Sequence, residues 1–179
     1  GGGILELEVD PVNELKSLNV FELKFGSVNG ISHAVKLPEH VSERQARSAR
    51  NILFDAGYES KIKIEHSNNS LGSGSGILLW TDGKTQVSGS SIGEPGKRAE
   101  EVGADAAREI LFHISRRSAV DRYMGDQIIP YMAIAGNSSV KTAELTQHAL
   151  TNIYMTEKFI NKKFHVDGNL GEEAVINVE

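Results

Sequence analysis

The chain has 179 residues, of which 39% are hydrophobic and 24% are charged, a balance typical of a soluble globular protein with one domain or two small ones. Its formal net charge of -5 excludes a polycation that binds nucleic acid through its overall field, so an RNA-binding role requires a local basic surface. The absence of cysteine excludes disulfides and thiolate metal sites. No apolar run approaches the roughly 20 residues that cross a bilayer, so we expect a cytoplasmic protein.

The first residues predict a strand, because apolar and acidic side chains alternate in "GGGILELEVD". The apolar positions are Ile4, Leu5, Leu7 and Val9, and the acidic ones are Glu6 and Glu8. No initiator Met precedes this run. Since natural domains seldom begin inside a pairing strand, we expect the chain to be the later part of a longer protein.

The next segments predict a hairpin, a helix and a strand. Two strand-like runs flank Gly26–Gly30 and predict a hairpin within residues 19–37. Pro38 and Gly57 stand where a helix starts and ends. The apolar residues that can form the buried face of this helix are Val41, Ala46, Ala49, Ile52 and Leu53. Residues 58–66 alternate with period two and predict a strand with Ile62 and Ile64 on one side.

The second half of the chain continues the mixture of strands and helices. Residues 76–89 predict a second hairpin with Asp82-Gly83 as its turn. Residues 97–117 predict a helix, whose apolar stripe is Ala99, Val102, Ala106, Ile110 and Ile114. An apolar segment follows within residues 121–136, and residues 162–166 and 174–179 predict closing strands. This order predicts an α+β protein with helices on one face of largely antiparallel sheets.

Two glycine-rich segments imitate phosphate-binding loops. In "GSGSGILLW", residues 72–80, the third glycine of a dinucleotide fingerprint is replaced by Ile77, and a strand follows where a helix is needed. The "GKT" of residues 83–85 lacks the first glycine of a Walker loop, because residue 78 is Leu78. We therefore interpret the two segments as a loop and a turn.

The basic residues of "SERQARSAR", residues 42–50, either meet RNA phosphates or form a solvated helix face, and both interpretations stay open.

The segment Glu144–Phe159 predicts an amphipathic helix in which His148 lies away from the apolar stripe. The stripe consists of Leu145, Ala149, Leu150, Ile153 and Tyr154. If the helix begins near Thr142, His148 lies in its N-terminal turns, where the macrodipole disfavours imidazolium and favours nearby anions. A neutral imidazole beside a phosphate is a competent nucleophile. From spacing alone, a surface or structural histidine stays the alternative, as it does for the other histidines, which show no metal-ligand spacing.

Three segments in this order resemble the C-terminal half of the RNA 3'-terminal phosphate cyclase family. They are "GEPGKRAEEVGADAAREIL", "DRYMGDQIIPYMAIAG" and "HALTNIYMTEKF". The resemblance covers essentially the whole chain and implies an α/β repeat unit of a larger cyclase domain with an inserted smaller α/β domain. It implies that residues 1–23 end a preceding repeat, residues 24–115 form the inserted domain and residues 116–179 form the last repeat.

The resemblance also implies an activity, in which ATP drives conversion of a 3'-terminal phosphate of RNA to a 2',3'-cyclic phosphodiester. His148 matches the family's histidine that accepts AMP before AMP passes to the RNA phosphate and the neighbouring 2'-hydroxyl displaces it. Tyr123 matches the aromatic residue that stacks on adenine. Asp126 matches the carboxylate near the phosphates and a divalent metal, Mg²⁺ or Mn²⁺, and Gln127 adjoins the same pocket.

The chain departs from the family in one respect. The family's N-terminal half, with a glycine-rich segment that helps to form the nucleotide and RNA site, has no counterpart in these residues. We therefore expect the chain to lack part of the active site, either because it is a fragment or because it needs that half as a separate partner. The alternative function is that of a non-catalytic cyclase-like protein that binds RNA or other components in ribosome assembly. Such relatives lack the nucleophilic histidine, so the presence of His148 favours the enzyme.

Overall fold

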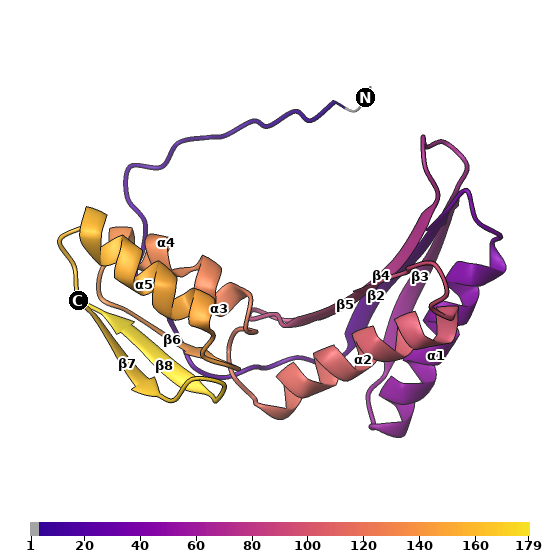
Figure 1. The fold of residues 1–179 in the computed structure, drawn as a ribbon. Helices are drawn as coiled ribbons and strands as arrows, with labels where there is room; N and C mark the ends of the chain where they lie inside the picture. Colours follow the sequence, from indigo (N-terminus) through magenta and orange to yellow (C-terminus); the bar gives the residue numbers. More distant parts are fainter. Residues whose placement is uncertain (1–3) are drawn as a thin grey trace.

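The computed structural model of the chain describes residues 4–179 and contains two sheets, each covered by helices on one face (Figure 1). This arrangement confirms the predicted α+β class. The part of the predicted first strand that falls on residues 1–3 lies outside the described residues. Between residues 4 and 179, no helix is both long and apolar enough to cross a membrane.

One sheet has the strand order β3-β2-β4-β5, and α1 and α2 pack along one of its faces. Its elements in chain order are β2 (Val28–Val35), α1 (His40–Asp55), β3 (Ser60–Ser67), β4 (Gly74–Thr81), β5 (Ser88–Ile92) and α2 (Ala99–Ser115). Strands β2 and β3 are parallel because α1 forms the crossover between them, whereas β4 pairs antiparallel with both β2 and β5.

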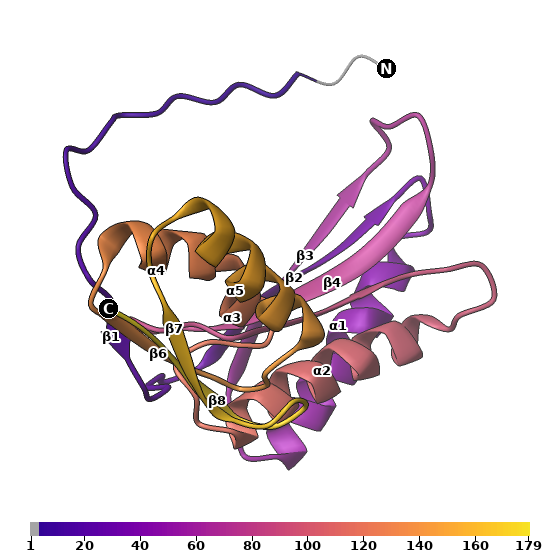
Figure 2. The ribbon, with the colours of Figure 1, turned by 60° about the vertical axis from the view of Figure 1, so that its left-hand side comes forward.

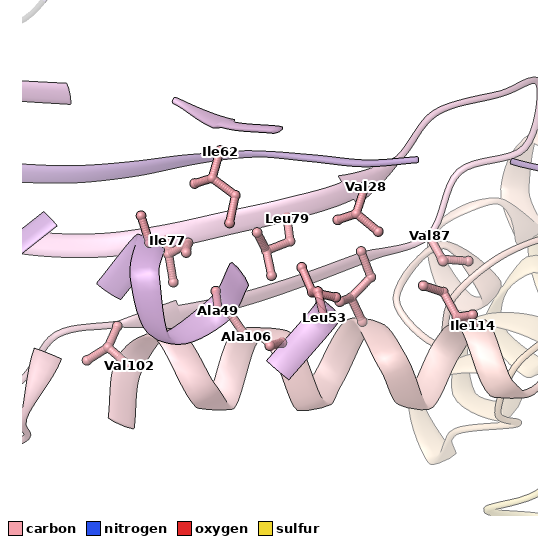
Figure 3. Close-up of a cluster of buried hydrophobic side chains, with 13 residues drawn as sticks. Val28, Ala49, Leu53, Ile62, Ile77, Leu79, Val87, Val102, Ala106 and Ile114 are labelled. Carbon is pink, nitrogen blue, oxygen red and sulfur yellow. The ribbon is translucent and has the colours of Figure 1, made fainter. Parts of the chain in front are cut away.

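Side chains from this sheet and from both helices meet in a buried core (Figure 3). Leu79 of β4, Val28 of β2 and Leu53 of α1 share this core and are completely buried. The predicted apolar stripe of α2 is buried along its whole length, at Ala99, Val102, Ala106, Ile110 and Ile114. Helical spacing in the sequence therefore identified the buried face of α2 correctly.

Helices α1 and α2 lie close together at Gly103. A Cβ atom at this position would overlap the backbone oxygen of Gln45 on α1. Gln45 is held in place, because its Oε1 accepts a hydrogen bond from the Ser32 hydroxyl at 3.0 Å and its Nε2 donates one to the Ser75 hydroxyl at 2.9 Å. The two helices can pack at this distance only with glycine at residue 103.

The other sheet has the strand order β1-β6-β8-β7, with α4 and α5 against it (Figure 2). Its elements and helices are β1 (Asn19–Val20), α3 (Met124–Gln127), α4 (Ile129–Ala135), β6 (Ser138–Thr142), α5 (Gln147–Phe159), β7 (Phe164–Gly168) and β8 (Ala174–Val178). The two strands predicted at the end of the chain are both formed and pair antiparallel. The second core includes Ile129, Val140 and Ile176.

The hairpin predicted within residues 19–37 is wrong. Strand β1 pairs parallel with β6 in one sheet, whereas β2 lies in the other sheet between β3 and β4. The N–H groups of Gly26 and Ser27 donate to Oδ1 of Asp82, at 2.6 and 2.9 Å. Because β1 and β2 lie in different sheets, the segment between them connects the two sheets. The Asp82 carboxylate holds the end of this segment through both amides.

The second predicted hairpin is formed by β4 and β5, but its turn is longer than Asp82-Gly83. Trp80 pairs with Ser88, and the N–H of Thr81 donates to the oxygen of Val87 at 3.0 Å. Residues 82–86 therefore form the loop. The carboxylate of Asp82, which suggested a tight turn, binds the segment before β2 instead.

The strand predicted at the start of the chain is also absent from the described residues. Residues 4–16 have no helix or strand, and Ile4, Leu5 and Leu7 are at least 83% exposed. A strand forms only where a neighbouring strand takes up its backbone hydrogen bonds. No strand within residues 4–179 pairs with this segment, so alternation of side chains alone does not order it.

We expect Gly103→Ala to destabilise the sheet that carries α1 and α2. Alanine favours a helix over glycine by about 1 kcal/mol, but the added methyl group would overlap the Gln45 oxygen, and overpacking costs about 1–3 kcal/mol. Urea unfolding followed by fluorescence of Trp80, the single tryptophan of the chain, should show a lower midpoint. Gly72→Ala, where a Cβ meets nothing within 4 Å, should not. An unchanged midpoint for Gly103→Ala would contradict the close approach.

Candidate active site

The histidine singled out by the sequence lies in the first turn of α5. The helix begins at Gln147, three residues after the start of the predicted segment Glu144–Phe159, and the condition of a start near Thr142 is not met, because Thr142 ends strand β6. Thr146 caps the helix, because its hydroxyl accepts a hydrogen bond from the N–H of Ala149 at 3.0 Å. His148 is therefore the second residue of α5, and its side chain is exposed. At this position the macrodipole favours an anion near the imidazole.

The apolar stripe of α5 differs in part from the prediction. Ala149 is buried, and Leu150 and Ile153 pack against the second core. Tyr154 is 58% exposed and lies under the amino group of Lys158, whereas Thr156 is buried. Ala149, Ile153 and Thr156 recur every three or four residues, so the stripe runs through them and leaves His148 outside it.

Helix α5 binds α3 one turn after the histidine. The side-chain amide of Asn152 donates a hydrogen bond to the backbone oxygen of Asp126 at 3.1 Å. Because residues four apart lie on the same side of a helix, His148 is on the side of α5 that faces α3. Gly125 lets α3 lie against β6, because a Cβ there would overlap the hydroxyl of Thr142. The fold thus brings His148 and Asp126 onto adjoining helices.

The Asp126 side chain is half-buried, and within residues 4–179 its carboxylate makes no hydrogen bond or ion pair. Gln127 ends α3 and is exposed. Among the described residues, no group of three or more histidine, aspartate or glutamate side chains could hold a metal ion by itself. A single carboxylate together with substrate phosphates and waters is nevertheless the usual way in which proteins bind Mg²⁺. Asp126 fits that kind of site.

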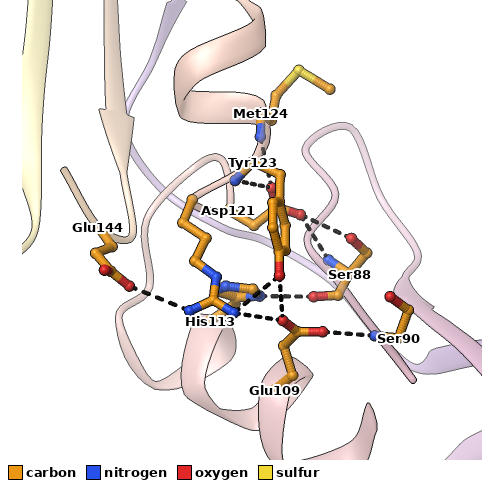
Figure 4. Close-up of polar contacts among 9 residues, drawn as sticks. Ser88, Ser90, Glu109, His113, Asp121, Tyr123, Met124 and Glu144 are labelled. Carbon is orange, nitrogen blue, oxygen red and sulfur yellow. Dashed lines mark hydrogen bonds and ion pairs between the residues drawn. The ribbon is translucent and has the colours of Figure 1, made fainter. Parts of the chain in front are cut away.

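Tyr123 lies at the junction of the two sheets, just before α3 (Figure 4). Its hydroxyl donates to Oε1 of Glu109 on α2 at 2.7 Å and accepts a hydrogen bond from Arg122 at 3.0 Å. The Arg122 guanidinium lies 4.9 Å from the ring centroid. Tyr123 as a residue is 45% exposed. Since a guanidinium covers one face, a planar ligand would stack on the other.

These contacts shift the pKa of each partner. The Glu109 carboxylate accepts the phenol's hydrogen bond and, with burial, raises the pKa of Tyr123, although Arg122 acts in the opposite direction. Burial acts to raise the pKa of Glu109, but donors from Ser90, Tyr123 and Arg122 outweigh it and the pKa is lowered. At neutral pH the pair is therefore a protonated phenol and an ionised carboxylate.

The sequence did not reveal the contribution of Glu109 and Arg122. Glu109 lies among acidic and basic residues on a predicted helix, where a solvated surface is the ordinary interpretation. The contact becomes visible only once α2 and α3 are placed together.

The other candidate segments do not join this site. Arg44 of the basic segment 42–50 binds Glu100 through two nitrogen atoms, each at 2.7 Å. This pairing favours the solvated helix face over a phosphate-binding surface. In the glycine-rich segment, strand β4 begins at Gly74, two residues before the predicted hairpin, so only residues 72 and 73 form the predicted loop.

Comparison with known proteins gives consistent matches. A family model described as the insert domain of RNA 3'-terminal phosphate cyclase matches residues 24–115. A protein named RNA 3'-terminal phosphate cyclase from Methanothermobacter thermautotrophicus is 49% identical over 178 residues, which are 99% of this chain and 52% of that protein. Proteins of the same name from Pyrococcus furiosus and Methanosarcina acetivorans are 44% identical over 180 residues and 48% identical over 144 residues. These matches cover 99% and 80% of this chain, and 52% and 39% of the respective relatives.

The chain spans about half the length of the first two of these curated relatives.

We expect Glu109→Gln to lower the pKa of Tyr123, because it removes the charge that holds the phenol protonated and leaves Arg122 in place. NMR titration of the tyrosine ring carbons should show the change. The hydrogen bond to Glu109 requires the protonated phenol, so its contribution to stability is present below the unfolded pKa of about 10. That contribution is lost as the pH rises through the raised native pKa.

Glu101→Gln is the matched control for this titration, because Glu101 lies on the same helix and binds Arg98. An unchanged Tyr123 titration in Glu109→Gln would contradict the contact.

Proposed function

The chain belongs to the RNA 3'-terminal phosphate cyclase family, and we propose that the protein uses ATP to convert the 3'-terminal phosphate of RNA to a 2',3'-cyclic phosphodiester. The observation that carries this proposal is the position of His148. The side chain is exposed in the first turn of α5, outside the stripe that packs the helix and on the side that faces Asp126. A histidine placed in this way contributes little to the core and is available to a ligand.

The proposed reaction has three steps. A ring nitrogen of His148 attacks the α-phosphorus of ATP, the bond to the bridging oxygen breaks, and pyrophosphate leaves. An oxygen of the RNA 3'-phosphate then attacks the same phosphorus, the phosphorus–nitrogen bond breaks, and His148 is regenerated. Finally, the 2'-hydroxyl attacks the 3'-phosphorus, loses its proton and displaces AMP.

Transfer of AMP to the RNA phosphate before ring closure has a chemical reason. An oxygen of a phosphate monoester is a poor leaving group, so direct closure of the ring by the 2'-hydroxyl is slow. Attachment of AMP converts this oxygen into part of a phosphoanhydride, which leaves readily. The imidazole serves as the covalent carrier because its nitrogen is nucleophilic when neutral and leaves when AMP is passed on.

Three further residues complete the proposed site. The partly exposed Tyr123 side chain suits stacking on adenine. Asp126 would bind Mg²⁺ or Mn²⁺ together with the phosphates of ATP, and such an ion neutralises phosphate charge. Gln127, exposed at the end of α3, would contact the same nucleotide. A non-catalytic RNA-binding role in ribosome assembly has less support, since such a role has no need of a nucleophilic histidine at this position.

We expect His148→Ala to abolish covalent labelling of the full-length protein by ATP labelled at the α-phosphate. The wild-type adduct should be acid-labile and base-stable, as a phosphorus–nitrogen bond is. His165→Ala is the matched control, because His165 is exposed on β7. Circular dichroism should be unchanged, since His148 lies outside the packed stripe. Labelling of His148→Ala at the normal rate would place the nucleophile elsewhere.

Asp126→Asn is expected to slow labelling without abolishing it. The amide keeps the size of the side chain but loses the charge that attracts the metal, while phosphates and waters still hold the ion. The rate should therefore recover in part as the Mg²⁺ concentration is raised. A rate independent of the metal concentration and equal to that of the wild type would show that Asp126 is not at the metal.

A further inference from the structure

Two carboxylates connect the inserted segment, residues 24–115, with the proposed nucleotide site: Glu109 belongs to that segment, and Asp121 follows it in the chain. Asp121 is the first and is 5% exposed. Its Oδ2 accepts hydrogen bonds from the N–H and the hydroxyl of Ser88 on β5, at 3.1 and 3.0 Å. Its Oδ1 accepts from the N–H groups of Tyr123 and Met124, at 3.1 and 2.8 Å. One oxygen thus binds the inserted segment, and the other binds the backbone that carries the tyrosine (Figure 4).

Glu109 is the second carboxylate, and its two oxygens likewise accept hydrogen bonds from different parts of the fold. Its Oε2 accepts a hydrogen bond from the N–H of Ser90 on β5 at 2.8 Å. Its Oε1 accepts from the Tyr123 hydroxyl at 2.7 Å and from Arg122 at 2.8 Å. Asp121 therefore holds the backbone of Tyr123, and Glu109 holds the far end of its ring.

A buried histidine supports the ring between these two points. His113 of α2 is completely buried, and its Nδ1 lies 2.7 Å from the backbone oxygen of Ser88. Because that oxygen can only accept, Nδ1 carries the proton. The His113 and Tyr123 rings meet edge to face, with centroids 6.3 Å apart and planes at 81°. Tyr123 is thus in contact with α2 along its side as well as at its hydroxyl.

The same network extends toward the histidine helix. The guanidinium of Arg122 lies 2.8 Å from Glu109 and 3.7 Å from Glu144, two residues before the cap of α5 at Thr146. Arg122 therefore connects α2 with the segment that leads into α5.

We propose that Asp121 and Glu109 are positioning residues for the nucleotide base, through which the inserted segment determines where the Tyr123 ring stands. This inference rests on the proposed function, in which Tyr123 stacks on adenine. Neither carboxylate needs to contact ATP. Each acts through Tyr123, so loss of either one should weaken recognition of the base while the phosphates are still bound.

The test measures ATP binding and labelling in the full-length protein for Glu109→Gln, Asp121→Asn, Tyr123→Phe and Tyr123→Ala. We expect the KM for ATP to rise about tenfold in the two carboxylate variants, as loss of a charge-assisted hydrogen bond would cause. The labelling rate at saturating ATP should stay within about twofold of the wild-type rate, because a contact that only positions the base contributes equally to the ground state and the transition state. Inhibition by inorganic tripolyphosphate, which has no base, should keep its wild-type constant. Glu101→Gln is the control on the same helix.

A double-mutant cycle separates positioning from general structural damage. Tyr123→Phe keeps the stacking ring but removes the hydroxyl that Glu109 holds, so Glu109→Gln should have little further effect in that background. If both carboxylate variants bind ATP like the wild type while Tyr123→Ala binds it weakly, the positioning role is wrong and the proposed site stands. Equal weakening of ATP and tripolyphosphate would also overturn the role. If Tyr123→Ala binds ATP normally, the base site itself is misassigned.

Discussion

The junction of the two sheets depends on how the buried carboxylate of Asp121 is satisfied. A carboxylate removed from water is stable only where hydrogen-bond donors replace its hydration. Here the donors come from two parts of the fold, Ser88 of β5 on one side and the backbone before α3 on the other. If the two parts separated, one oxygen would lose its partners, and a buried acceptor without a donor is costly. The carboxylate therefore couples the two sheets.

Through this coupling, the residues of the proposed site are connected to both sheets. The residues that follow Asp121 include Tyr123 and the α3 helix with Asp126, and α3 is bound in turn to α5 by Asn152. Glu109 holds the same segment from the side of α2. A displacement of α2 or β5 would thus be transmitted to the tyrosine ring and to α3. In the proposed reaction these contacts would keep the adenine base in register with His148.

Helices were predicted better than strand pairings, for a physical reason. The stripe of α2 and the limits of α1 follow from local spacing and from punctuation by Pro38 and Gly57, which involve residues near one another in the chain. The hairpin within residues 19–37 failed, because β1 and β2 pair with strands of different sheets. Alternating side chains show that a segment can form a strand, but they do not identify the partner that supplies its hydrogen bonds.

The sequence by itself determined the α+β class, the buried face of α2, the burial of Ala46, Ala49 and Leu53 on α1, and the separation of His148 from the stripe of its helix. The resemblance of its motifs to a known family added Tyr123, Asp126 and Gln127 as candidate residues. Only the tertiary structure decided that α5 begins at Gln147, that Tyr154 faces outward and that Glu109 holds the Tyr123 hydroxyl. Glu109 and Tyr123 are separated by a helix end and a turn, so their contact depends on how α2 packs against the junction. Side-chain periodicity carries no information about such packing, because it describes one element at a time.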